Sequence, residues 1–167
     1  MPRSFDVSFE SPASVGQVHS AFGAQDYWRA RLADFGGSKT LDSLVVGADG
    51  AVRVVVTEDL RHGKLPRILA KFYRGDLNVV STEVWTPIGD GRVGGEISVA
   101  VTGAPGSGHG SGVLASLGSG SRLTFAATVE FKVPLVGGTI ESFIAREFAQ
   151  WIPEIQRFTT KWISEHA

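Results

Sequence analysis

The chain of 167 residues contains no cysteine, so disulfide bridges and cysteine-based zinc sites are excluded. It also lacks a run of about 18 apolar residues, the length that a membrane-spanning helix needs. Its first residues, MPRSFDVSFESP, contain no apolar segment of the kind that follows the basic end of a secretory signal. We therefore expect a cytoplasmic protein made of one domain, residues 1–167.

A strong net charge is absent as well, because 16 basic and 17 acidic residues give a formal charge of −1. Such a surface does not attract nucleic acid, and we expect no nucleic-acid partner. The four histidines are scattered without paired spacing, which predicts no metal site.

Nucleotide-binding motifs are missing too. Gly103 and Gly108 have the spacing of a phosphate-binding loop, but His109 and Gly110 stand where Lys and Ser or Thr are needed. The glycines of residues 103–122 fit neither the dinucleotide-binding pattern G-x-G-x-x-G nor the pattern G-x-S-x-G that surrounds a nucleophilic serine. We expect no cofactor.

The first third of the chain predicts a strand, two short helices and a hairpin. Phe5, Val7 and Phe9 alternate with polar residues, which is typical of a half-buried strand. Ser11 can cap a first helix that ends at Gly23, and a second short helix follows at about 26–34. Next come two valine-rich runs joined by an Asp-Gly turn, which sets Leu41 opposite Glu58.

The middle of the chain predicts further strands. A hairpin is expected around residues 87–92, and residues 122–133 alternate between apolar and polar side chains. Between these lies Gly103–Arg122, GAPGSGHGSGVLASLGSGSR, in which Gly and Ser dominate. Because flexible glycine-rich segments are costly to order, we interpret it as a mobile hairpin region at the mouth of a cavity.

A long helix, starting at about Thr139, closes the chain. Its apolar residues cover an arc of about 200°, roughly twice what a helix resting on a sheet needs. The residues that define this arc are Ile140, Ile144, Phe148, Trp151, Ile155, Phe158 and Trp162, which recur at spacings of three and four, together with Phe143, Ile152 and Ile163, which widen the arc. The order of elements predicts an α+β fold with an antiparallel sheet and helices on one face.

This order resembles the helix-grip fold of the START-like superfamily (SRPBCC), which includes lipid-transfer domains, birch-type pollen allergens and polyketide cyclases. The resemblance rests on FDVSFESPASVGQVHSAFGAQDYW at the start and on VEFKVPLVGGTIESFI and FTTKWI at the end. The VPLVGG-x-IE junction is similar to that of an uncharacterised actinobacterial branch. The resemblance implies a curved sheet of about six or seven strands around the long helix, with two short helices after the first strand.

The resemblance also implies a cavity between sheet and helix. Ligand pockets are mostly apolar with a few placed polar groups. The candidate ligand-binding residues are Val54, Val56, Trp85, Val99, Phe125, Val129, Phe143, Phe148, Trp151 and Ile155.

Three side chains are candidates for acid–base chemistry: Glu83, Glu96 and His19. The sequence leaves open which face of the strand at Asp76–Pro87 lines the cavity. If the face that carries Glu83 and Trp85 is concave, Glu83 is a buried carboxylate that can anchor a ligand or transfer a proton.

Three functions remain open. The chain is a carrier for a hydrophobic small molecule such as a lipid, a fatty acyl or a polyketide-like compound; a cyclase or dehydratase on the same fold; or an interaction domain, like a co-chaperone, with a filled core. We expect a carrier, monomeric or weakly dimeric. Residues Arg61–Arg74 carry five basic and no acidic side chains, which suggests transient contact with a membrane surface.

Overall fold

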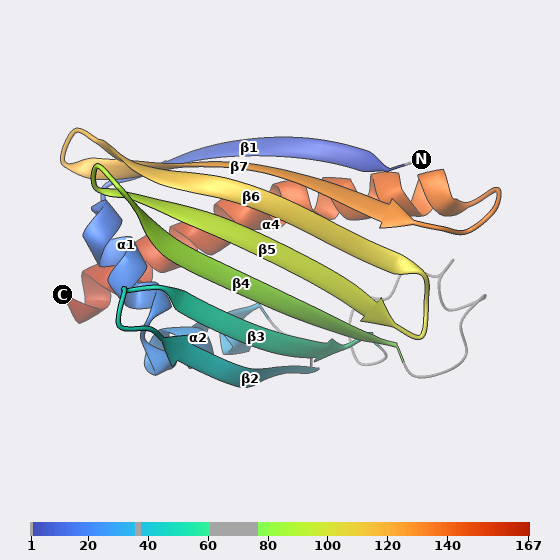
Figure 1. Cartoon of the computed structure of the whole chain (residues 1–167), viewed down its shortest axis with the longest axis horizontal. Coiled ribbons are helices and arrows are strands. Elements are labelled where there is room, and N and C mark those ends of the chain that lie inside the picture. Colours follow the sequence, from blue (N-terminus) through green and yellow to red (C-terminus); the bar gives the residue numbers. More distant parts are fainter. Residues whose placement is uncertain (1, 36–37, 61–76) are drawn as a thin grey trace.

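The computed structural model describes residues 2–35, 38–60 and 77–167. The chain starts with a strand and two short helices, continues with antiparallel strands and ends with a long helix (Figure 1). The elements are β1 (Arg3–Ser11), α1 (Val15–Phe22), α2 (Gln25–Asp34), β2 (Ser38–Val46), β3 (Val52–Asp59), β4 (Asn78–Gly89), β5 (Arg92–Thr102), β6 (Gly106–Leu117), β7 (Gly120–Phe131) and α4 (Gly137–His166).

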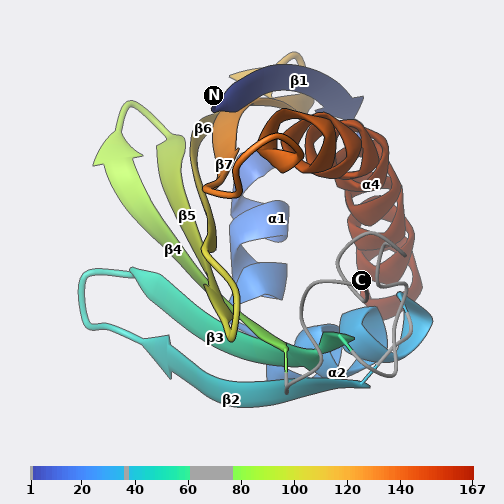
Figure 2. The same ribbon diagram turned by 90° about the vertical axis from the view of Figure 1, so that its right-hand side faces the viewer.

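The seven strands form one sheet in the order β1-β7-β6-β5-β4-β3-β2, and every neighbouring pair is antiparallel. The sheet is curved, and α4 runs across its concave side (Figure 2). The helices α1 and α2 lie at the end of the sheet where α4 terminates (Figure 1). The α+β helix-grip architecture expected from the sequence is therefore confirmed.

The glycine-rich stretch is not a mobile hairpin region, and that interpretation of Gly103–Arg122 was wrong. Residues 106–117 form the regular strand β6, hydrogen-bonded to β5 on one side and β7 on the other. Its glycines at positions 106, 108, 110 and 112 all point to the concave side. A Cβ on Gly110 would lie 2.4 Å from the Phe125 ring, so glycine lets this ring lie flat across the neighbouring strand.

Two local expectations also need correction. Ser14, not Ser11, caps α1: its hydroxyl accepts the backbone N–H of Gln17, whose side chain accepts the N–H of Ser14. In the first hairpin, Glu58 pairs with Lys39 rather than Leu41, because the register shifts between Leu41 and Ser43.

The main hydrophobic core fills the end of the sheet that α1 and α2 cover. The ring of Phe22 lies 4.9 Å from that of Trp85, and Tyr27 packs edge-on against Trp28 at 5.5 Å. Valines at alternate positions of β3, together with Leu114 of β6, complete this region. Here the interior is closed by side chains.

Candidate functional site

The concave face of the sheet is defined by alternate residues of each strand. In β4 these include Glu83 and Trp85, which are 8% and 3% exposed. Val54 of β3 pairs with Glu83, and Ile97 of β5 pairs with it on the other side. The structure thus settles which face of this strand lines the interior: it is the face of Glu83.

Glu83 is held by two donors at the closed end of the interior. Arg31 of α2 donates from Nη2 to Oε2 at 3.2 Å, and Trp85 donates from Nε1 to Oε1 at 3.2 Å. The Arg31 guanidinium carbon lies 4.4 Å from the centre of the Trp28 ring, a cation–π geometry. The site contains a charge pair that is neutral as a whole, with each charge fixed in orientation.

Tyr27 lies on the same face of α2 as Arg31, one turn before it, and joins this group to α4. The Thr159 hydroxyl donates to the Ile155 carbonyl at 2.8 Å, so the Tyr27 hydroxyl donates to Thr159 across 2.6 Å. Burial raises the pKa of Tyr27 above its ordinary value. Tyr27 is therefore a hydrogen-bond donor rather than an acid at neutral pH.

The charge state of Arg31 is equally fixed. Burial alone would lower the pKa of Arg31, but the neighbouring Glu83 carboxylate outweighs burial, and the pKa of Arg31 lies above its ordinary value. The guanidinium is therefore permanently charged. Its side chain is largely buried, with 14% exposure.

A second carboxylate, Glu58, shares the concave face of β3 with Val54 and Val56. Burial raises the pKa of Glu58, and the Lys39 ammonium on β2 opposes this shift. Glu83 pairs with Val54, which lies four residues before Glu58 on β3. The two carboxylates therefore lie at different positions along the same concave face.

Beyond the closed end, apolar side chains of the two opposing surfaces are only partly buried. On the sheet these include Val99 and Val101, and on α4 they include Phe148, Trp151 and Ile155. The strands on which α4 packs closely are β1 and β7. The inward-facing side chains of β4 and β5 therefore keep solvent-accessible area on the inside of the fold.

Aromatic rings line the β1 and β7 side of this space. Phe5 of β1 stacks on Phe148 of α4 at 6.5 Å and lies 6.4 Å from Phe125 of β7. Trp151 meets Phe148 edge-on at 5.7 Å. These rings give the interior an apolar wall of limited flexibility.

The candidate ligand-binding residues divide between the closed core and the partly exposed space: Val54, Val56, Trp85 and Phe125 belong to the core, and Val99, Phe148, Trp151 and Ile155 are only partly buried. Those on strands all point to the concave side: Val54, Val56, Trp85, Val99, Phe125 and Val129. Phe143 differs, because it is 39% exposed. Tyr27, Arg31 and Thr159 were missed, since no sequence signal links α2 to β4 or α4.

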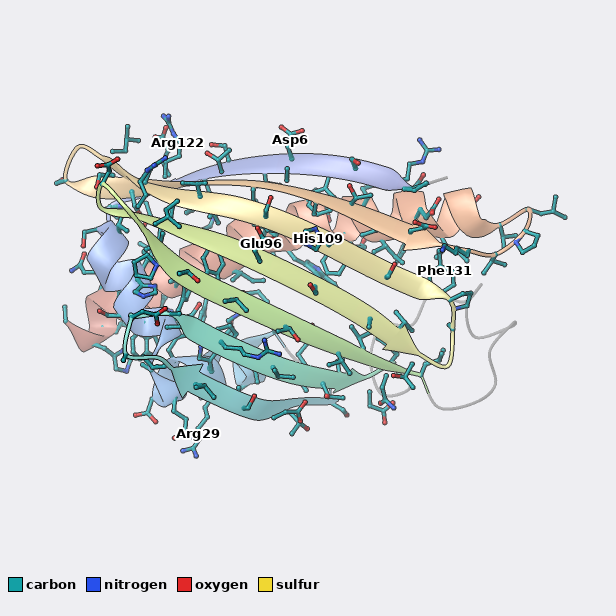
Figure 3. The ribbon with its side chains drawn as sticks, viewed as in Figure 1. Asp6, Arg29, Glu96, His109, Arg122 and Phe131 are labelled. Atoms are coloured by element: carbon teal, nitrogen blue, oxygen red, sulfur yellow. The ribbon has the colours of Figure 1, made fainter. Side chains whose placement is uncertain are left out.

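The other two candidates for acid–base chemistry lie away from Glu83. Glu96 is on the convex face, where its exposed carboxylate lies 3.3 Å from Nε2 of His109 (Figure 3). His19 is partly buried on α1, and its Nε2 donates to the carbonyl of Gly50 at 2.6 Å. His19 therefore ties α1 to the turn between β2 and β3. The basic segment Arg61–Arg74 and Asp76 lie outside the described residues.

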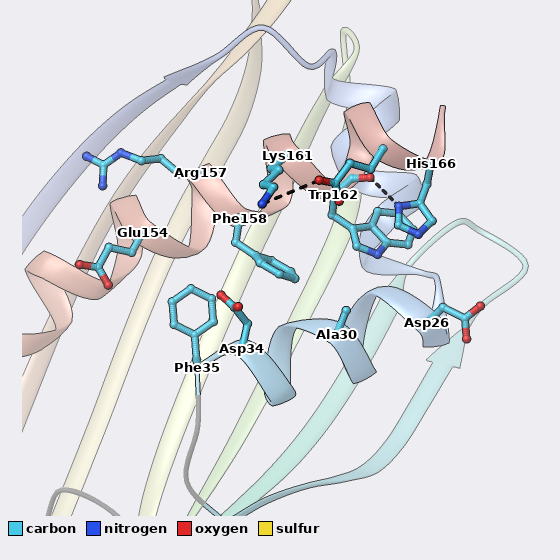
Figure 4. Close-up of a pocket in the computed structure, with 11 residues that line it drawn as sticks. Asp26, Ala30, Asp34, Phe35, Glu154, Arg157, Phe158, Lys161, Trp162 and His166 are labelled. Atoms are coloured by element: carbon cyan, nitrogen blue, oxygen red, sulfur yellow. Dashed lines mark hydrogen bonds and ion pairs between the residues drawn. The ribbon is translucent and has the colours of Figure 1, made fainter.

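A separate groove of about 590 Å³ lies on the outside of the molecule, between α2 and the last turns of α4 (Figure 4). Ala30 leaves room between the two helices, and Phe35 meets Phe158 edge-on at 5.8 Å. Phe158 and Trp162 separate this groove from Tyr27 in the core. The groove is thus a surface feature distinct from the concave interior.

Comparison with solved structures defines the class of fold. The chain matches TTHA0849 from Thermus thermophilus with a TM-score of 0.65 and 13% identity over 99% of both chains. It matches truncated norcoclaurine synthase from Thalictrum flavum with a TM-score of 0.60 and 13% identity, over 100% of this chain and 96% of that one. A START superfamily protein from Mycobacterium smegmatis matches with a TM-score of 0.56 and 9% identity, over 98% and 99%. The fold is that of the START-like, helix-grip proteins.

Sequence comparison gives the family. The model of DUF2505, described as a protein of unknown function, matches residues 6–163, and the chain belongs to this family. The uncharacterized protein Rv0481c of Mycobacterium tuberculosis H37Rv is 38% identical over 99% of both chains, and Mb0491c of Mycobacterium bovis matches equally. These relatives agree with the actinobacterial resemblance. Within residues 2–35, 38–60 and 77–167, no helix has the length and apolar character that crossing a membrane requires.

Proposed function

We propose that the protein binds a hydrophobic small molecule between the concave face of the sheet and α4. The observation that carries this proposal is that apolar side chains of the concave face, including Val99 and Val101, and of α4, including Trp151 and Ile155, are only partly buried. A core filled by its own side chains would bury them, as it does at the α1 and α2 end.

The binding energy would come from removing apolar ligand surface from water, at about 25 cal/mol per Å². Arg31 and Glu83 would orient the ligand, since Glu83 lies on the concave face and both side chains keep a small exposed fraction. Because the pair is neutral, it suits an uncharged polar group such as a hydroxyl or a carbonyl better than a full charge. An apolar body with one such group is the ligand class that we propose.

The cyclase or dehydratase alternative stays a prediction. One fold neighbour is a synthase by name, and in this alternative the buried Glu83 would transfer the proton. Its two donors, Arg31 and Trp85, stabilise the carboxylate rather than free it, which favours a binding role.

A pair of substitutions on β6 tests the proposal. Gly108 points to the interior, and a Cβ there would make only ordinary contacts, 3.5 Å from Val129 and 3.7 Å from Val99. Gly108→Leu should therefore fill the proposed space without a backbone clash. Ser107→Leu adds the same side chain on the convex face and is the matched control.

The assay is fluorescence titration with the uncharged apolar dye Nile red, followed by displacement with 1-hexadecanol, an apolar chain with one hydroxyl. We expect wild type and Ser107→Leu to bind the probe alike, and Gly108→Leu to bind at least about tenfold more weakly, as expected when a methyl-rich side chain occupies a pocket. A wild-type protein that binds neither compound would refute the proposal and favour the interaction-domain alternative. Equal binding by Gly108→Leu and wild type would refute the location.

A further inference from the structure

Two turns at one end of the sheet form an apolar tip, which we define as Pro105 of the β5–β6 turn and Val133, Pro134, Leu135 and Val136 of the β7–α4 connection. Pro105, Pro134 and Leu135 are exposed, whereas Val133 and Val136 pack partly against Phe131 and Ile140. Leu135 is 104% exposed, so it has no shelter from any neighbour. Its φ is +69°, a left-handed conformation that disfavours every residue with a Cβ. A large apolar side chain in a strained conformation, fully in water, gains nothing within the fold.

The backbone holds this tip rigidly. The N–H of Lys132 donates to the carbonyl of Pro105 at 3.0 Å, which joins the β5–β6 turn to the β7–α4 connection. The N–H of Gly137 donates to the carbonyl of Val133 at 2.9 Å. The buried carboxylate of Glu141 accepts the N–H of Phe131 at 2.9 Å, which anchors α4 to the end of β7. Leu135 is therefore presented outward by a fixed turn.

The tip also has a defined place and charge. It follows Phe131 at the end of the sheet opposite α1 and α2, where α4 begins (Figures 1 and 3). Residues 103–105 and 131–140 contain Lys132 and no acidic residue. Arg3 pairs with Val129 in register, next to this end, and Glu130 is ion-paired with Lys132 at 3.6 Å. The charge beside the tip is therefore positive on balance.

We propose that this tip inserts into the interfacial region of an anionic lipid bilayer. A stable protein interface uses about 20 to 30 residues on each side, and five residues fall far short of that. A few exposed apolar side chains with adjacent cations are sufficient for reversible attachment to a bilayer surface. The basic segment Arg61–Arg74 plays no part in this inference. If the bilayer is also the source of the bound apolar molecule, that role rests on the proposed function. The attachment of the tip to the bilayer does not depend on it.

Co-sedimentation with vesicles tests the attachment. One set contains equal parts of phosphatidylcholine and phosphatidylglycerol, and the other contains phosphatidylcholine alone. We expect wild type to partition into the anionic vesicles more strongly than into the neutral ones. Leu135→Asp should lower the partition coefficient by about tenfold or more, as expected for withdrawing one leucine from an apolar phase.

Leu135→Gly separates a binding role from a structural one. Glycine accepts the positive φ without strain, so this variant should be at least as stable as wild type in urea. Its partition coefficient for the anionic vesicles should nevertheless fall as that of Leu135→Asp does. Leu117→Asp is the control, because Leu117 is 39% exposed at the opposite end of the sheet and should partition like wild type. Gly108→Leu should also partition like wild type, which distinguishes failure of attachment from failure of the proposed cavity.

Three results would overturn the proposal. The first is a wild-type protein that binds neither vesicle set. The second is a Leu117→Asp variant whose partition coefficient falls as far as that of Leu135→Asp. The third is a Leu135→Gly variant that binds the vesicles like wild type. Concentration-dependent dimerisation that Leu135→Asp abolishes would assign the tip to a second copy of the chain instead.

Discussion

Replacing Arg31 by methionine removes the cation from the buried pair while keeping an unbranched side chain over the Trp28 ring. The Glu83 carboxylate, 8% exposed, then keeps the Trp85 indole as its donor and loses its counter-charge. Removing one partner of a buried pair costs about 3 to 5 kcal/mol, because the remaining charge is left uncompensated.

We expect Arg31→Met to lower the free energy of unfolding by about 3 kcal/mol at pH 7, the lower end of this range, because Trp85 still donates to the carboxylate.

A double-mutant cycle completes the test. Glu83→Gln keeps an acceptor for the Trp85 indole but removes the negative charge beside the Arg31 guanidinium. It should therefore also lower the free energy of unfolding by about 3 kcal/mol. The double variant with Arg31→Met leaves no charge, and we expect a coupling energy of about 2 kcal/mol or more from urea denaturation. Single losses below about 1 kcal/mol or additive effects would refute the reasoning.

Two further predictions concern the concave face. Gly110→Ala should destabilise the protein by about 1 to 3 kcal/mol in urea, because its Cβ would lie 2.4 Å from the Phe125 ring. Gly108→Ala is the control and should be neutral or slightly stabilising, because its Cβ would make only ordinary contacts. Equal losses of stability in the two variants would contradict this account of β6. Burial raises the pKa of Glu58, so its contribution to stability is present below the ordinary glutamate pKa and is lost as pH rises through the folded value. Glu58→Gln should therefore be more stable than wild type at pH 7, with no difference below about pH 4, and denaturation curves that show the opposite order at pH 7 would contradict this.

The elements that carry regular apolar side chains were predictable from the sequence. Phe5, Val7 and Phe9 alternate as β1 does, and the broad apolar arc of residues 140–162 corresponds to α4, which meets β1, β7 and both short helices. In these segments the apolar side chains report the periodicity of the backbone directly.

Strand β6 could not be recognised in that way. Its first four concave positions are glycines, which contribute no apolar side chain to a pattern of period two, and only Leu114 follows them in the core. Glycine alternates with Ser107, His109 and Ser111 in the sequence. The reason for this alternation lies in the neighbouring strand β7, whose Phe125 and Phe131 rings lie over the glycines of β6.

The polar group at the closed end was predictable only in part. Glu83 was identifiable as an ambiguous carboxylate, but its partner Arg31 lies 52 residues earlier, on a helix whose position over the sheet is a property of the fold. Tyr27 and Thr159 are 132 residues apart, and their hydrogen bond depends equally on tertiary packing.

The central claim, that the space between the sheet and α4 holds an apolar ligand, is tested most directly by native mass spectrometry. Wild type, Gly108→Leu and Ser107→Leu are purified alike, compared with their denatured masses and incubated with 1-hexadecanol if they carry no adduct. We expect a discrete apolar adduct on wild type and Ser107→Leu that organic solvent extracts, and none on Gly108→Leu. A wild-type protein that stays free of adduct after incubation, or a Gly108→Leu variant that carries the same adduct, would contradict the account.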